Sequence, residues 1–185
     1  MPRLPKGFTL LELIVTLAIA GILTGIAIPN FVGLLKNNRL ISKNNDLLTA
    51  LTLGKSEALK RATSVTLCKR NALGTNCDSG RLWSDGWLLF NDLNSNAAVD
   101  AADEVLRVYE PLPTGISLTY AFNQVTFNSL GFSSGYTGTF KFCDDRGATY
   151  SRGLIIAHTG QLTQPDDADL DGIKEDINGN NFTCP

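Results

Sequence analysis

The chain has 185 residues, which is enough for one folded domain with an appendage. Its hydrophobic content of 43% and charged content of 18% suit a globular protein and exclude a chain that is disordered throughout. The net charge of −2, without a basic tail, gives no compositional sign of a nucleic-acid-binding protein.

Residues 8–29 form an apolar run with Glu12 as its single charged residue. An α-helix of this length covers about 33 Å, enough to cross a hydrocarbon core of roughly 30 Å. The run is longer than the apolar part of a signal peptide, and no A-x-A-like cleavage site follows it. Since Arg3 and Lys6 precede the run, the positive-inside rule predicts a single-pass protein with a cytoplasmic N-terminus and an exported remainder.

The carboxylate of Glu12 is costly in this place. A charged side chain at the centre of a membrane helix costs about 2.5–3.5 kcal/mol, and somewhat less near the end of the helix. Such a charge usually has a partner, and the apolar run itself contains no basic residue. We therefore expect Glu12 to pair with a group on another chain.

The stretch KGFTLLELIVTLAIAGILTGIAIPNF, residues 6–31, resembles the class III signal and N-terminal helix of type IV pilins and type II secretion pseudopilins. The resemblance implies that a prepilin peptidase cleaves after Gly7 and methylates the new N-terminus at Phe8. It also implies that Glu12, then the fifth residue, pairs with the N-terminal amine of a neighbouring subunit. Pro29 matches the proline that kinks the helix in this family.

This resemblance divides the chain into three parts. It implies that residues 1–7 are a leader peptide and that residues 8–30 are a transmembrane helix that forms the core of a filament. It further implies that residues 31–185 are a periplasmic globular domain that includes the C-terminal half of the helix.

Apolar residues continue at helical spacing to about Arg61 and predict one stripe that packs against the domain. The residues of this stripe are Leu40, Leu47, Leu48, Leu51, Ala58 and Ala62. Beyond the helix the apolar period changes to two, and Gly, Asn and Asp separate the short runs as turns require. Strands are predicted at 64–68, 86–90, 105–109, 116–121, 124–127, 139–143, 154–157 and 160–163. One long helix followed by many short strands predicts an α+β fold in which antiparallel sheet packs on the helix.

Three blocks beyond the membrane segment narrow the family: SEALKRATSVTLC, DGWLLFNDLNSNAAVDAADEVLRVYE and CDDRGATYSRGLIIAHTGQL. They resemble the GspH/FimT-like group of minor pilins and minor pseudopilins, whose globular domain is rich in β-structure. The segment CKRNALGTNC, with its two cysteines, is more similar to the FimT/FimU pilus branch than to the secretion branch.

The four cysteines, Cys68, Cys77, Cys143 and Cys184, all lie in the part expected to be exported. An even number in an oxidising compartment predicts two disulfides. Three pairings are possible, and the economical one joins Cys68 to Cys77 and Cys143 to Cys184. A zinc site is disfavoured, because the chain has no CxxC pair and a single histidine.

The acidic segment DADLDGIKEDIN places Asp167, Asp169 and Asp171 at alternate positions before a glycine. Carboxylates spaced in this way converge on one centre, which suits the six to eight oxygen ligands of Ca²⁺. Together with Asp176 they are the candidate Ca²⁺ ligands, although Asn178 stands where an EF-hand loop has a bidentate Glu. The alternative is a solvated acidic turn. A second segment, DLNSNAAVDAADE, lacks the turn glycine, and we expect an ordinary hairpin loop there.

Lys69 and Arg70 belong to a local basic cluster near the end of the helix, with Lys55, Lys60 and Arg61. Lys and Arg supply most non-specific affinity for DNA, so Lys69 and Arg70 are the candidate nucleic-acid contacts. The resemblance weighs against DNA, because competence pilins of this branch carry a C-terminal Gly-Arg-x-Arg motif where this chain reads GQLT. A solvated basic face is the favoured interpretation.

No catalytic set is apparent in the sequence. The single histidine, His158, lies in the strand-like stretch LIIAHTG, where a side chain at a strand end is expected. No phosphate-binding glycine loop is present either. Enzyme activity is therefore not expected, and Ca²⁺ is the only cofactor that the residues suggest.

These features predict a minor type IV pilin that primes or caps pilus assembly. Its expected partners are major and other minor pilins, the prepilin peptidase and the inner membrane, from which it passes into the pilus tip. One alternative is a minor, GspH-like pseudopilin of the type II secretion system. The other is a DNA-binding subunit of the pilus tip that serves natural transformation.

Overall fold

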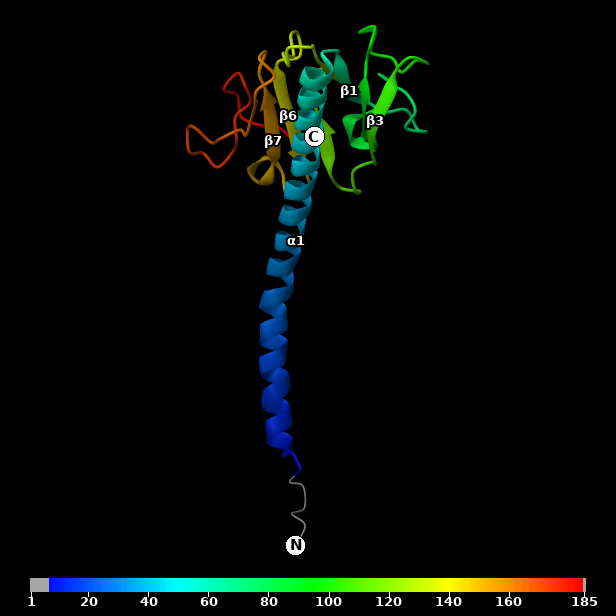
Figure 1. Cartoon of the computed structure of the whole chain (residues 1–185). Coiled ribbons are helices and arrows are strands. Elements are labelled where there is room, and N and C mark those ends of the chain that lie inside the picture. Colours follow the sequence, from blue (N-terminus) through cyan, green and yellow to red (C-terminus); the bar gives the residue numbers. More distant parts are fainter. Residues whose placement is uncertain (1–6, 185) are drawn as a thin grey trace. The chain divides into compact units, whose positions relative to one another are not determined.

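The computed structural model describes residues 7–184, so residues 1–6 of the predicted leader lie outside the described part. Helix α1 (Leu10–Arg61) comes first, and the strands follow it in sequence (Figure 1). The strands are β1 (Val65–Lys69), β2 (Trp87–Asn91), β3 (Glu104–Tyr109), β4 (Ser117–Thr119), β5 (Gln124–Phe127), β6 (Gly138–Cys143), β7 (Arg152–Ile156) and β8 (Leu162–Thr163). Two 3₁₀ helices, η1 (Trp83–Asp85) and η2 (Ala148–Tyr150), lie between them. The predicted α+β fold is confirmed.

The chain separates into two compact units, residues 1–38 and residues 39–185. The boundary falls inside α1, eight residues beyond the predicted limit at 30/31. Within the first unit α1 passes through position 29 without a break, and the side chain of Pro29 lies outside the described part. By length and composition α1 could cross a membrane: its most apolar stretch has a mean hydropathy of 2.3 and is not buried.

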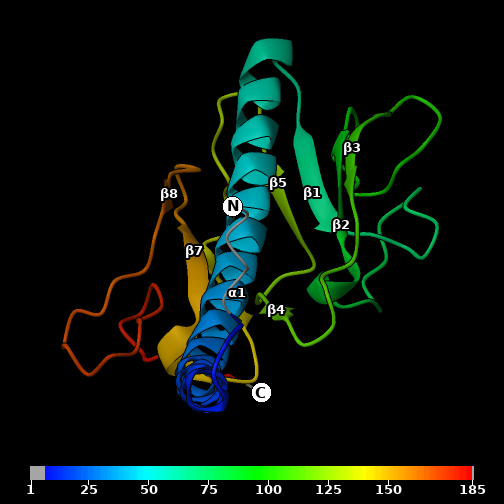
Figure 2. The ribbon, with the colours of Figure 1, turned by 90° about the horizontal axis from the view of Figure 1, so that it is seen from below.

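The strands of the second unit form two antiparallel sheets of four strands each. One sheet has the order β3-β2-β1-β5, and the other has the order β4-β6-β7-β8. Strand β1 is central in the first sheet, where Leu67 lies opposite Leu89 on one side and Val125 on the other. Figure 2 shows β1 and β5 on one side of α1 and β7 on its other side. Both sheets therefore contribute side chains to one core beneath the second half of the helix.

The core joins the helix stripe to the inner faces of both sheets. Leu47, Leu51 and Ala58 of α1 have no exposed surface. They belong to one cluster with residues of β1, β2, β5, β6 and β7, namely Val65, Leu67, Leu89, Val125, Phe127, Phe140, Phe142, Leu154 and Ile156. The predicted stripe is wrong at Ala62, which is exposed and has a φ of +54°. This left-handed residue ends the helix rather than extending its apolar face.

An aromatic group connects the two sheets. Trp83, from the link between β1 and β2, lies edge-on to Phe140 of β6 with ring centroids 5.2 Å apart. Its Nε1 donates a 2.8 Å hydrogen bond to the carbonyl oxygen of Phe122. Tyr120 stacks on Phe140 at 3.8 Å between ring centroids and also lies edge-on to Trp83. Trp83 is buried and its Nε1 is hydrogen-bonded. Its ring therefore contributes apolar packing between the sheets without leaving a buried polar atom unpaired.

Two disulfides fasten the ends of this domain. One joins Cys68 of β1 to Cys77, nine residues on, and the other joins Cys143 of β6 to Cys184, 41 residues on. Cys143 and Cys68 are both buried. The second bridge therefore ties the C-terminal segment to the end of a core strand.

Gly160→Ala is expected to destabilise the domain by at least about 2 kcal/mol, because the site is both left-handed and crowded. Gly160 has a φ of +68°, and a Cβ there would lie 2.2 Å from the carbonyl oxygen of Gly131. Gly135→Ala is the matched control, since Gly135 has a φ of +84° but no atom within 4 Å of the added Cβ. Urea unfolding of both variants measures the difference. Equal losses of stability would show that the contact with Gly131 is unimportant.

Candidate functional site

Helix α1 begins with a capping box. The backbone N–H of Thr9 donates to Oε2 of Glu12 at 2.9 Å, and the Thr9 hydroxyl lies 3.0 Å from the same oxygen. In return, the backbone N–H of Glu12 donates to Oγ1 of Thr9 at 3.3 Å. Thr9 is thus the N-cap and Glu12 the third helical residue, which is the spacing of this motif. The carboxylate also lies at the end of the helix where the macrodipole favours negative charge.

The capping box corrects part of the interpretation of Glu12. No partner for this carboxylate was expected within the apolar run, whereas the structure gives it Thr9. The pattern Thr-x-x-Glu before an apolar helix is a known start signal and could have revealed the contact. Thr9 is neutral, however, so the negative charge itself is not compensated by these contacts. Oxygen Oε1 takes no part in the contacts with Thr9.

Behind this cap, the first unit presents an apolar surface on all sides of the helix. More than half of the surface of many of its large side chains is exposed, among them Leu10, Leu11, Leu13, Ile14, Leu17, Ile19, Ile22, Leu23 and Ile28. A surface of this extent is characteristic of a segment covered by lipid or by other helices.

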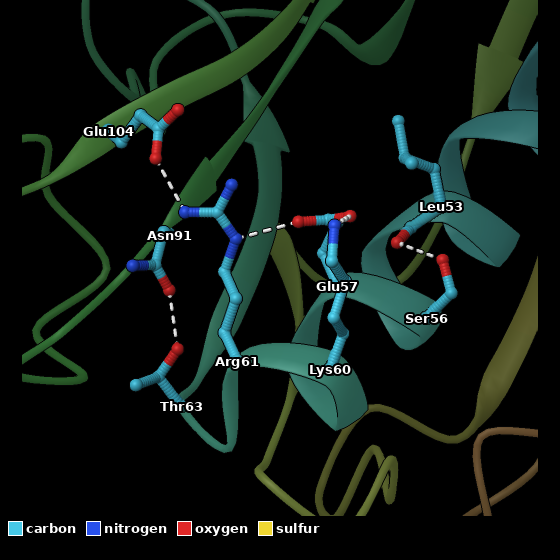
Figure 3. Close-up of polar contacts among 8 residues, drawn as sticks. All are labelled: Leu53, Ser56, Glu57, Lys60, Arg61, Thr63, Asn91 and Glu104. Carbon is cyan, nitrogen blue, oxygen red and sulfur yellow. Dashed lines mark hydrogen bonds and ion pairs between the residues drawn. The ribbon is translucent and has the colours of Figure 1, made fainter.

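The opposite end of α1 is held by an ion-pair network (Figure 3). The Nε of Arg61 lies 2.6 Å from Oε2 of Glu57, and its Nη1 contacts Glu104 at the start of β3. The hydrogen bonds with Glu104 and then Glu57 raise the pKa of Arg61. Close by, Thr63 Oγ1 donates to Oδ1 of Asn91 at 2.6 Å. These contacts join the helix end to the strands β2 and β3.

Three members of the predicted basic cluster, Arg61, Lys69 and Arg70, have partners within the protein. Arg61 is paired as described, and Lys69 Nζ donates to Oδ1 of Asn123 at 2.8 Å. Arg70 pairs with Glu110 at 3.2 Å, and its side chain is only 11% exposed. The two candidate nucleic-acid contacts, Lys69 and Arg70, therefore have partners within the protein, and one of them is largely buried.

The acidic segment after β8 is arranged differently from the predicted ligand set. The structure brings Asp167 and Asp169 together with Glu175, not with Asp176. Asp176 instead pairs with Lys141 at 3.2 Å. Burial raises the pKa of Asp176, but backbone N–H donors and Lys141 outweigh it, so its pKa is lowered.

The fourth predicted ligand, Asp171, lies outside the group as well. Its Oδ1 accepts a 2.8 Å hydrogen bond from the N–H of Ile173, and its Oδ2 accepts from the side chain of Asn181. Asp171 thus shapes the turn, while Glu175 is the member of the carboxylate group that the predicted set missed. Glu175 and Asp176 are adjacent in sequence, but Glu175 joins the group while Asp176 pairs with Lys141.

The second acidic segment is the hairpin loop between β2 and β3. Asp92 is fully buried and accepts hydrogen bonds from the Thr66 hydroxyl and from the N–H groups of Asn96 and Ala97. The carboxylates of this loop thus serve to fold the loop. Elsewhere, His158 is exposed beyond the end of β7, with its ring edge-on to that of Phe132.

Comparisons with known proteins agree with this geometry. Residues 44–160 match the family described as type II transport protein GspH, and residues 3–28 match the prokaryotic N-terminal methylation motif. The pilin-like protein PilA1 of Thermus thermophilus is 34% identical over 104 residues. The match covers 54% of this chain and 56% of PilA1, so the chain spans little more than half the length of that relative.

Solved structures with a similar fold include the type IV minor pilin FimU of Pseudomonas aeruginosa in two crystal forms. One has a TM-score of 0.55 at 23% identity and covers 71% of this chain and 91% of FimU. The other has a TM-score of 0.53 at 22% identity, with 69% and 93% covered. The GspH match alone extends over more than half of the chain, and the methylation motif covers the start of its apolar helix. The chain belongs to the GspH/FimT-like family of type IV pilin-like proteins, which comprises minor pilins and pseudopilins.

Proposed function

We propose that the protein is a minor type IV pilin that primes or caps pilus assembly after cleavage between Gly7 and Phe8. The observation that carries the proposal is the start of α1, where Glu12 is fixed by Thr9 and no ion pair among residues 7–184 compensates its charge, at the end of a membrane-length apolar helix. A terminal amine at Phe8 of a neighbouring subunit has the charge and the position to pair with it. The helix would then pass from the inner membrane into the core of a filament.

The pilus is favoured over the secretion machine by the relatives. PilA1 is called a pilin-like protein and FimU a minor pilin. The structural match covers 91% of the FimU chain. A minor pseudopilin of type II secretion is the second candidate, because the matching family is described as a type II transport protein. In both machines the chemistry of Glu12 and Phe8 would be the same. The difference lies in the partner subunits.

A DNA-binding subunit is not favoured by the described side chains. Non-specific DNA affinity needs Lys and Arg that are free to approach phosphates. Arg70 is largely buried against Glu110, and Lys69 is engaged by Asn123. The turn at Gly160 carries Gln161 and Thr163 where the related competence pilins carry arginines.

Deletion of the gene, with complementation, tests the proposal through four readouts: surface pili, twitching, protein secretion and transformation. The expected result is loss of pili and twitching with secretion intact. Intact pili with lost secretion would assign the protein to the secretion machine. Loss of transformation alone would assign it to DNA uptake.

A further inference from the structure

Three carboxylates converge in the segment that follows β8. Asp167, Asp169 and Glu175 each contribute an oxygen, and these oxygens all lie within 4.8 Å of one another. The segment is anchored on its C-terminal side, where Phe182 is buried and Cys184 is bonded to Cys143. Like charges are thus held close together on a part of the chain that is fastened to the domain.

Two oxygens of this group are buried without a partner. Asp167 Oδ1 and Glu175 Oε1 each expose less than 1 Å² and form no hydrogen bond among the described residues. The other oxygen of each is used: Gly172 N–H donates to Asp167 Oδ2 and Ala168 N–H donates to Glu175 Oε2, both at 2.9 Å. Glu175 as a residue is partly exposed, but its carboxylate oxygen Oε1 is buried. A buried charged acceptor without a donor or a cation is costly.

No basic side chain among the described residues forms an ion pair with the group. Among residues 7–184, no ion pair joins a lysine or arginine to Asp167, Asp169 or Glu175. Three clustered carboxylates with two buried, unpartnered oxygens and no ion pair among the described residues therefore favour the binding of a cation.

We propose that Asp167, Asp169 and Glu175 bind a Ca²⁺ ion. Carboxylates without histidine or cysteine suit a hard cation with oxygen ligands rather than Zn²⁺ or Cu²⁺. Mg²⁺ requires a near-ideal octahedron and keeps several of its waters, so three clustered carboxylates suit Ca²⁺ better. An open pocket of about 630 Å³, lined in part by Asp169 and Glu175, gives access to the group and room for water ligands.

The ion would act on the fold of the C-terminal segment. It would connect Asp167, just after β8, to Glu175, which lies on the return of the chain toward Cys184. The turn between them is already closed by the hydrogen bond from Gly172 to Asp167. Bound Ca²⁺ stabilises the folded segment by mass action, since the unfolded chain has no such site. This site is independent of the proposed role in the pilus.

Calcium titration of the full chain tests the site. The chain is purified in detergent micelles, treated with EGTA and titrated with CaCl₂ by isothermal titration calorimetry. One Ca²⁺ per chain is expected to bind, and Glu175→Gln and Asp169→Asn should each weaken the affinity at least about tenfold. Asp166→Asn is the nearby control: Asp166 is exposed and lines the same pocket, but its carboxylate is not part of the group, so the affinity should stay within about threefold.

Three results would overturn the proposal. They are no Ca²⁺ binding by the wild-type chain, an equal loss of affinity in Asp166→Asn and Glu175→Gln, and displacement of Ca²⁺ by an equimolar amount of Mg²⁺. Thermal unfolding in EGTA shows that the variants are folded. Glu175→Gln and Asp169→Asn each remove one charge from a like-charged group, so both should be at least as stable as the wild type without the ion. Unfolded variants would contradict the charge argument.

Discussion

Glu12→Gln is expected to be cleaved normally after Gly7 but to be excluded from filaments. Glutamine can keep the capping-box hydrogen bonds with Thr9, so the start of the helix is preserved while the charge is lost. The terminal amine of the neighbouring subunit would then be buried without a counter-charge, which costs about 3–5 kcal/mol. Incorporation should fall by roughly 100-fold or more. Quantitative immunoblots of sheared filaments and membranes measure the ratio.

Two further variants distinguish the effect of the Glu12 charge from the effect of the capping box at the start of α1. Thr9→Ala removes the N-cap hydroxyl at a cost of about 1 kcal/mol but keeps the carboxylate, so it should still enter filaments. Glu12→Ala removes both contributions and should be excluded as Glu12→Gln is. If Glu12→Gln entered filaments like the wild type, the carboxylate would have only its local role with Thr9.

Removal of the disulfide between Cys143 and Cys184 should destabilise the domain by about 4 kcal/mol, against about 2.7 kcal/mol for the bridge between Cys68 and Cys77. The two bridges span 41 and nine residues, and the longer loop restricts the unfolded chain more. Cys68 and Cys143 are both buried, so replacing each by alanine should remove a comparable amount of side-chain packing. The larger bridge also fastens the C-terminal segment next to the buried Phe182.

The measurement compares two double variants of the full chain by urea unfolding. One is Cys143→Ala with Cys184→Ala, and the other is Cys68→Ala with Cys77→Ala. Reduction of the wild-type chain should lower its stability at least as much as the larger of the two. A greater loss from the short bridge than from the long one would show that native packing, not loop length, sets the effect.

Much of the fold follows from short-range patterns in the sequence. The change of apolar period from helical spacing to two after Arg61 locates the end of α1 and the strands behind it, because burial on one face imposes that period. The prediction fails at Ala62. Helical spacing from Ala58 places it in the apolar stripe, whereas the residue is exposed beyond the end of α1. Its left-handed backbone depends on the turn into β1, which periodicity does not describe.

The sites depend more on contacts between distant residues. Arg61 is paired by Glu104, 43 residues away, so its availability to DNA cannot be judged from the run of basic residues around it. In the acidic segment, the alternate spacing correctly brings Asp167 and Asp169 together, but the third member is Glu175, selected by the path of the turn. The contact of Thr9 with Glu12 is local, and its signature was present in the sequence.

Mass spectrometry of sheared, purified pili would decide whether the chain is a processed subunit of the pilus. We expect a peptide of this chain that begins at N-methylated Phe8, present in small amount relative to the major pilin. Its abundance in the pili should be lost when Glu12 is replaced by glutamine. Recovery of the chain in the membrane fraction alone, or with residues 1–7 still attached in the pili, would contradict its assignment as a processed pilus subunit.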